Sequence, residues 1–302
     1  MHARSRLCCW TLLLASVALL AAGCSKKEFP AELEAYRTAV EASKLEYVRI
    51  RADSERGTAP WASKFRGTPY RPKGMAYPLG RDGQPLSLLA QINFADMPPL
   101  TDYPRAGILQ FFIGGEGKGH IWGMALDDEQ PYDENRHFQK LQDQAYFRVV
   151  YHPVVTTDLE ELDTDSPPIP DWVLPVMTEA ALTFETDAEY VQVYDYRFEK
   201  VFGKDPSSVF DGDDGYDLAN RYAEFSYRPG LAKVGGYASF VQEDPRRIRP
   251  AEDWLVLLEI RSGFEGDVEA MWGDAGVGVF MIRRADLKKL DFSHVAYNWD
   301  NH

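Results

Sequence analysis

Short apolar runs bounded by Gly, Pro or polar residues recur along the 302-residue chain. Five of them are LEYVRIRA (45–52), LLAQI (88–92), GILQFFI (107–113), VLLEI (256–260) and GVGVFMI (276–282). Runs of this length, rich in β-branched and aromatic residues, are typical of buried strands. Helical spacing is clearest at residues 30–43, 216–225 and 286–290, and residues 179–203 mix strand-like and helix-like pieces. The pattern predicts an α+β fold with many strands.

The same three blocks occur in the same order in both halves of the chain. SKFRG, LLAQI and GILQFFI in the first half are matched by AKVGG, VLLEI and GVGVFMI in the second. The span from Lys64 to Ile113 is 49 positions, and so is the span from Lys233 to Ile282. This agreement predicts an internal duplication, because repeated blocks at a fixed spacing are the signature of a repeated unit.

The duplication predicts two similar β-rich halves, about residues 45–150 and 216–302, that share one core and carry flanking helices. Gln91 and Glu259 take matching places in the middle block of each half. Each is a polar residue inside an otherwise apolar run, so both halves are expected to carry a polar group at the same point of a buried strand.

The N-terminal pattern is typical of a secretory signal. Arg4 and Arg6 precede the uncharged apolar run LCCWTLLLASVALLAAG, residues 7–23, which ends at Cys24. The small residues Ala-Ala-Gly directly before this cysteine resemble the lipobox of bacterial lipoproteins. We therefore expect residues 1–23 to be a lipoprotein signal peptide and Cys24 to carry the lipid, including palmitate.

The mature chain is expected to consist of a lipidated short tether, residues 24–29, and a domain over residues 30–302. The alternative is an uncleaved membrane anchor, which needs ~20 apolar residues and therefore a longer run than this one. Ser25 stands where an Asp retains many lipoproteins at the inner membrane. The resemblance to sorted lipoproteins thus implies an outer-membrane anchor that faces the periplasm.

The positions of the cysteines exclude cysteine-based chemistry from the folded domain. Cys8 and Cys9 lie inside the predicted signal, so the mature chain keeps only the acylated Cys24. A disulfide, a thiolate nucleophile and a cysteine metal site are then excluded from the domain.

The chain is acidic, with 33 Lys and Arg against 47 Asp and Glu and a formal net charge of −14. The signal contains two arginines and no acid, so the mature chain carries a formal charge of −16. An acidic surface repels nucleic acid and anionic lipid headgroups, so we expect no nucleic acid partner and contact with the membrane through the lipid alone. Solubility accounts for the charge more simply than a specific cationic partner does.

Five longer stretches are distinctive, namely SKFRGTPYRPKGMAYP, PLSLLAQINFADMPPLTDYPRAGILQFFI, KVGGYASFVQEDPR, MWGDAGVGVFMI and DLKKLDFSHVAYNWD. They resemble the YwqG-like family of bacterial proteins (DUF1963). The resemblance runs from about residue 29 to the C-terminus and implies a mixed α+β fold, but no reaction and no ligand. The chain departs from the family at Arg66-Gly67, where Gly-Gly is often found.

Motifs for catalysis or metal binding are few. The chain has no GxSxG, HExxH, GxxxxGK[ST] or paired-cysteine motif. GGEGKG (114–119) lacks the Ser or Thr of a phosphate-binding loop and predicts a hairpin loop. Asp211, Asp213 and Asp214 offer oxygen ligands for Ca²⁺, but Tyr216 falls where such a loop requires Gly. A solvated loop is expected there, calcium is the weaker alternative, and no metal or cofactor is predicted.

The most suggestive constellation for a ligand site is Trp272, Asp274, Tyr297, Trp299 and Asp300. Carboxylates beside aromatic rings can bind or hydrolyse a sugar, because rings stack on the pyranose face and acids bond hydroxyl groups. The competing hypothesis is a tight turn at residues 272–274 that leads into a strand, with Trp272 buried and its indole N–H hydrogen-bonded. The turn is favoured.

Two classes of function follow from the sequence. The favoured one is a non-enzymatic, lipid-anchored binding or protein-interaction module with a possible partner protein in the envelope, because no nucleophile, base or metal set is recognisable. The alternative is an envelope glycan- or small-ligand-binding protein, or a hydrolase, that uses the Trp/Asp constellation. Whether the protein is an enzyme stays open, with the balance towards a binding role.

Overall fold

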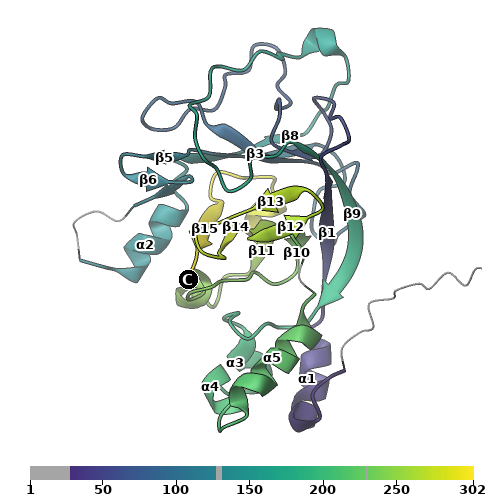
Figure 1. Cartoon of the computed structure of the whole chain (residues 1–302), viewed down its shortest axis with the longest axis vertical. Helices are drawn as coiled ribbons and strands as arrows, with labels where there is room; N and C mark the ends of the chain where they lie inside the picture. Colours follow the sequence, from purple (N-terminus) through teal and green to yellow (C-terminus); the bar gives the residue numbers. More distant parts are fainter. Residues whose placement is uncertain (1–27, 127–130, 229) are drawn as a thin grey trace, which may run out of the picture.

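The computed structural model describes residues 28–126, 131–228 and 230–302. The predicted signal peptide and the lipidation site Cys24 lie outside these residues. The main element is one antiparallel sheet of ten strands in the order β15-β14-β11-β10-β1-β9-β2-β3-β4-β8 (Figure 1). In chain order the strands are β1 (Leu45–Asp53), β2 (Lys64–Phe65), β3 (Ser87–Asn93), β4 (Ile108–Ile113), β8 (Phe147–His152), β9 (Ala180–Glu189), β10 (Ala232–Gly235), β11 (Trp254–Arg261), β14 (Val277–Arg283) and β15 (Ala296–Asp300).

Smaller elements flank the sheet. Two short antiparallel groups are β5 (Glu116–Gly117), β6 (His120–Ile121) and β7 (Met124–Ala125), and β12 (Gly263–Glu265) with β13 (Val268–Ala270). The helices are η1 (Ala31–Tyr36), α1 (Arg37–Ala42), α2 (Glu134–Leu141), η2 (Leu159–Glu161), α3 (Phe198–Phe202), α4 (Pro206–Val209), α5 (Gly215–Ser226), η3 (Pro245–Ile248) and α6 (Arg284–Leu287). Among the described helices, none combines the length and the apolar composition that crossing a bilayer requires.

The sheet is strongly curled, so that its two ends pack on one core (Figure 1). β4 and β14 belong to opposite flanks of the sheet, yet the rings of Phe111 and Phe280 have centroids 4.9 Å apart. The outermost strands also meet, because Phe147 of β8 lies 5.2 Å from Tyr297 of β15. Alternate residues of a strand point to the same face, so one face of each flank is apolar and enters this shared core.

The β5–β7 group closes the gap between the two ends of the sheet. The Tyr297 hydroxyl donates to the carbonyl oxygen of Trp122 at 2.7 Å, and Trp299 Nε1 donates to that of Ile121 at 3.1 Å. Gln144 Nε2 donates to the carbonyl oxygen of Phe292 at 2.7 Å on the same side. Side chains of the last strand therefore fasten one end of the sheet to the other.

The two flanks of the sheet follow the same order outward from the central β1–β9 pair. One flank is β10-β11-β14-β15 and the other is β2-β3-β4-β8. The register shifts between Leu88 and Ala90 on β3, and between Val256 and Leu258 on β11. β1, the first strand of the chain, lies beside β10 of the C-terminal flank, and β9 lies beside β2 of the N-terminal flank.

A separate cluster of helices lies at one end of the molecule (Figure 1). α1, α3, α4 and α5 surround a small aromatic core in which Phe198 and Tyr222 are buried. Phe29, the second residue described, is also buried there, with its ring 5.0 Å from that of Phe225 on α5. The start of the domain is thus held against α5.

The strand runs expected from the sequence are confirmed, and the fold is a β-rich mixture of strands and helices. The helical segment at residues 30–43 starts as the 3-10 helix η1 before it becomes α1, and the GGEGKG segment contributes to the β5–β6 hairpin. The strand β9 was not recognised within the mixed segment 179–203, because its ten residues include several polar ones that face solvent.

A substitution at the meeting point of the two flanks tests the shared core. Phe280→Ala is expected to lower the free energy of unfolding by about 3–5 kcal/mol, because a buried aromatic ring is replaced by a cavity between β14 and β4. Phe264→Ala, at a residue that is 68% exposed, is the matched control and is expected to change it by less than about 0.5 kcal/mol. Urea unfolding measures both; equal effects would contradict a core shared by the two ends.

Candidate functional site

The segment at residues 272–276 forms the tight turn that the sequence favours. Gly273 has φ 56°, and the amide of Gly276 donates to the carbonyl oxygen of Trp272 at 2.9 Å. Trp272 is fully buried, with ring centroids 6.0 Å from Trp122 and 6.3 Å from Trp299. One expectation was wrong: its indole N–H finds no hydrogen-bond acceptor among the described residues. The ring fills the space between the sheet ends and presents no face to a ligand.

Three of the four remaining residues of the predicted ligand constellation also make structural contacts. Tyr297 and Trp299 make the contacts that close the sheet. The Asp300 carboxylate accepts from the amides of Val241 and Gln242, at 3.1 and 3.0 Å, and burial raises its pKa. Asp274 is exposed on the turn. Within the described part of the chain no contact joins the two acids, so the structure gathers the three rings but does not assemble an acid pair.

The acidic segment considered for calcium is the connection between α4 and α5. Asp211, Asp213 and Asp214 are all exposed there, and Asp214 precedes the first turn of α5. Within the ranges that the structure describes, no group of three or more His, Cys, Asp or Glu side chains could hold a metal ion.

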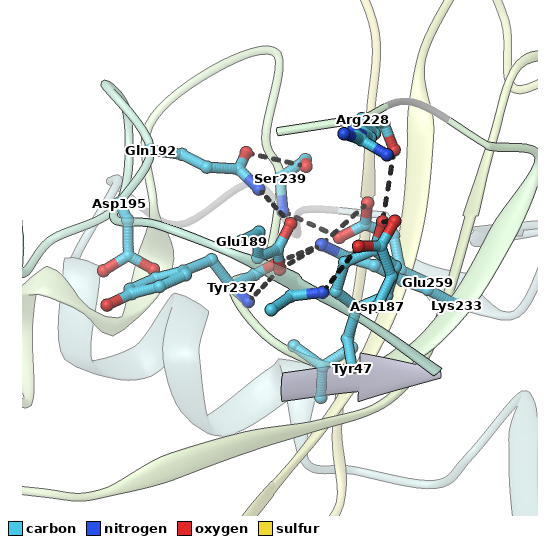
Figure 2. Close-up of polar contacts among 12 residues, drawn as sticks. Tyr47, Asp187, Glu189, Gln192, Asp195, Arg228, Lys233, Tyr237, Ser239 and Glu259 are labelled. Atoms are coloured by element: carbon cyan, nitrogen blue, oxygen red, sulfur yellow. Dashed lines mark hydrogen bonds and ion pairs between the residues drawn. The ribbon is translucent and has the colours of Figure 1, made fainter. Parts of the chain in front are cut away.

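A buried polar cluster, of which the sequence indicated only Glu259, lies on the outer face of β9, β10 and β11 (Figure 2). We call Glu189, Lys233 and Glu259, which are at most 2% exposed, the Glu189 cluster. Lys233 Nζ donates to Glu189 Oε1 at 2.7 Å and to the carbonyl oxygen of Tyr237 at 2.6 Å. Glu189 also accepts from the Tyr237 amide at 2.5 Å and from Gln192 Nε2 at 3.1 Å.

Glu259 completes the cluster, and only one of its two carboxylate oxygens accepts a hydrogen bond from the described residues. Its Oε2 accepts from the amide of Ser239 at 2.8 Å. Its Oε1 is buried and receives no hydrogen bond from the described residues, although Lys233 Nζ and an Arg261 nitrogen each lie 3.9 Å away. A buried carboxylate oxygen gains when it is hydrogen-bonded, so Glu259 is the point of the cluster that can still accept a donor.

The backbone next to Lys233 is shaped by the same carboxylates. Gly235 and Gly236 have φ of 83° and 70°, a region that favours glycine. A Cβ at Gly236 would collide with the carboxylate of Glu189. Glycine is therefore required here for both conformation and space, and the close approach lets the Tyr237 amide reach Glu189.

A second ion network adjoins the first, formed by Asp195, Arg197, Asp244 and Arg246. Arg246 is fully buried and lies 2.9 Å from Asp195 and 2.7 Å from Asp244. Arg197 Nε donates to Asp195 at 2.7 Å. Together the two networks and the neighbouring Arg261 contain four acids and four bases, so these eight residues carry no net formal charge.

A pocket of about 340 Å³ opens above these networks, and we call it the α5 pocket. One wall is α5, and the others are the segment after β9 and the segment between β10 and η3. Its polar and aromatic lining includes Gln192, Tyr194, Tyr216, Asn220, Ser239 and Arg261. Gln192 and Ser239 are bonded to each other at 3.1 Å and also contact the Glu189 cluster, so they connect the pocket to the charges below it.

The family model of DUF1963, a domain of unknown function, matches residues 63–301. The chain belongs to the DUF1963 family. The matched span starts just before β2 and ends just after β15, so the DUF1963 domain contains the Glu189 cluster and the lining of the α5 pocket except His302, whereas β1 precedes it. The resemblance of the sequence to the YwqG-like family is thereby confirmed. No curated protein matches the chain.

The pKa of Glu189 gives the cluster a measurable signature. Burial raises this pKa to about 6 from an ordinary value of 4.5, and Lys233 opposes the shift. Between these two pH values the folded protein holds a proton that the unfolded chain has lost, so stability falls as the pH rises, by about 2 kcal/mol in total. Glu189→Gln is expected to lack this fall, as measured by urea unfolding from pH 4.5 to 6.5.

The comparison is made as a difference between variant and wild type, because other groups titrate in the same range. Burial lowers the pKa of His152 to about 4, which gives both proteins a rise of stability with pH. Glu199→Gln, at an exposed glutamate, is the control and should follow the wild-type profile. An unchanged slope in Glu189→Gln would mean that Glu189 does not titrate in this window.

Proposed function

We propose that this DUF1963 protein is a non-enzymatic binding module of the bacterial envelope, and that the α5 pocket receives a neutral, hydroxyl-rich ligand such as a sugar unit. The observation that carries the proposal is the pocket itself, whose lining combines polar and aromatic side chains with apolar ones and lies on a cluster of four acids and four bases. A charged ligand would bring a charge that has no opposite charge left to compensate it. An uncompensated charge in a partly buried site costs free energy.

The lining suits a sugar in two further respects. Gln192, Asn220 and Ser239 offer amide and hydroxyl groups, which donate and accept as sugar hydroxyls do. Tyr194 and Tyr216 are 69% and 83% exposed, so their rings are free to cover an apolar sugar face. The proposal therefore keeps the glycan hypothesis but moves it from the Trp/Asp constellation to the α5 pocket.

Binding without catalysis is supported by the bonding of the acids. Glu189 is held by Lys233, Gln192 and a backbone amide, and Asp195 by two arginines. An acid anchored in this way cannot turn towards a substrate, whereas a general acid must reach the group to which it gives its proton. A protein partner in the envelope stays a prediction, supported by the acidic surface alone.

Saturation-transfer NMR with glucose, galactose, N-acetylglucosamine and glucuronate tests the ligand class. We expect at least one neutral sugar to bind and glucuronate to bind more weakly. Tyr216→Ala should weaken binding by roughly fivefold, because a covering ring is lost. Tyr132→Ala is the control, because Tyr132 is 69% exposed but lies outside this pocket. Absence of any neutral sugar binding, or a greater effect at Tyr132, would refute the proposal.

We further propose that the protein is a lipoprotein anchored through Cys24 in the outer membrane. Phe29, five residues later, is buried against α5, and five extended residues reach at most about 18 Å. Lipidation at Cys24 would therefore hold α5 and its pocket close to the membrane, where envelope glycans are abundant. The support for lipidation itself is the Ala-Ala-Gly-Cys sequence.

Metabolic labelling with a palmitate analogue tests the anchor. Cys24→Ala is expected to abolish labelling and to release the protein from the membrane fraction, because the acylated thiol is lost. Cys9→Ala, within the signal, is the control and should be labelled like the wild type. Labelling that persists in Cys24→Ala would remove the basis for an envelope location.

We also propose that the two flanks of the sheet descend from a duplication, with the second repeat starting at β9 and not at residue 216. The matching strand order and the matching register shifts support this. So do two equivalent bonds of 2.8 Å, from the Tyr70 amide to Gln91 Oε1 and from the Ser239 amide to Glu259 Oε2. Arg66 keeps the positive φ, 55°, that Gly235 has in the other flank.

A further inference from the structure

A second pocket, of about 280 Å³, lies on the other flank of the sheet, and we call it the first-half pocket. Its floor is the outer face of β4 and β8, and its roof is the segment from residue 69 to residue 79. None of its lining residues lines the α5 pocket, so it is independent of the function proposed above.

The first-half pocket is mostly apolar. Phe112 and Val150 form its floor, and Met75, Pro78 and Leu79 lie along its roof. The polar groups of the floor are already satisfied by one another. Gln110 Nε2 donates to the carbonyl oxygen of Tyr70 at 2.8 Å and to Gln91 Oε1 at 2.7 Å, and Gln110 Oε1 lies 2.9 Å from His152 Nε2.

The roof is anchored at both ends, so the pocket is built before any ligand arrives. Arg71 binds Asp163 at 2.8 Å, and the amide of Lys73 donates to the carbonyl oxygen of Glu161 at 2.8 Å. At the other end, Leu79 forms an antiparallel bridge with Pro85. A preformed apolar cavity with few polar groups is the usual form of a small-molecule site.

The positive charge at the mouth of the pocket belongs to Arg148. Arg148 projects from β8 and lines the pocket, and its only hydrogen bond within the described chain is a long one, 3.5 Å, to the carbonyl oxygen of Leu79. It has no carboxylate partner there, whereas Arg71 is paired with Asp163. The planar guanidinium of Arg148 is suited to bind a carboxylate through two bonds.

We propose that the first-half pocket binds a small amphipathic carboxylate, with its apolar part between the roof and Phe112 and its carboxylate on Arg148. The volume admits roughly ten non-hydrogen atoms, because a water molecule in the liquid takes about 30 Å³ and bonded atoms take less. Octanoate has this size and is the probe. One carboxylate balances the charge of Arg148, whereas a doubly charged phosphate would exceed it.

Isothermal titration with octanoate and with octanamide, the neutral analogue of the same length, tests the proposal. Octanoate is expected to bind at least about tenfold more tightly than the amide, because it alone forms charge-assisted bonds to Arg148. Arg148→Gln should remove this difference. Arg105→Gln, at an exposed arginine outside the pocket, is the control and should preserve it.

Ala76→Trp provides a second variant that does not depend on charge. Ala76 is exposed on the roof, so a larger side chain there can enter the pocket without disturbing the core. This variant is expected to abolish binding of both compounds. Equal affinity for octanoate and octanamide, retention of the preference in Arg148→Gln, or no binding of octanoate to the wild type would overturn the proposal.

Discussion

The packing of the two ends of one curled sheet against each other is the constraint on which the other features depend. Phe111 and Phe280 meet although their strands lie on opposite flanks, and Phe147 meets Tyr297 although β8 and β15 are the two edges. Apolar side chains of this core fill the inner face of the sheet. The Glu189 cluster and the first-half pocket therefore lie on the outer face. The same constraint commits the aromatic residues near the C-terminus to closing the sheet.

The strands were predictable where apolar residues run continuously, because a strand of this sheet is buried on its inner face and largely covered on its outer face. β3, β4, β11 and β14 are of this kind. β9 was missed because much of it faces solvent. The turn at Trp272 could be predicted from local chemistry, but the missing partner of its indole N–H could not, because that depends on packing between distant segments.

The Glu189 cluster could not be assembled from sequence, because its three residues come from different strands and are 26 or more positions apart. A signal was nevertheless present. Lys233 and Glu259 each interrupt an apolar run, and a charge inside a buried strand requires a partner. The sequence pattern did not identify the partner, Glu189. The register of β9 against β1 determines which residue of β9 lies beside Lys233.

The two pockets differ in electrostatics in a way that separates their expected ligands. Beneath the α5 pocket each acid has a base, so the region favours a neutral ligand with many hydroxyl groups. At the first-half pocket, Arg148 borders an apolar cavity and has no carboxylate partner among the described residues. This arrangement favours an apolar ligand with a single negative charge. The two pockets thus differ in chemistry through a few side chains.

Amide chemical-shift mapping during titration with N-acetylglucosamine tests the central functional claim most directly. We expect shifts concentrated in α5 (Gly215–Ser226) and in residues 238–241, which line the α5 pocket. Shifts concentrated at Trp299 and Asp300 would instead return the site to the C-terminal aromatic constellation. The absence of shifts in α5 at saturating sugar would contradict the account.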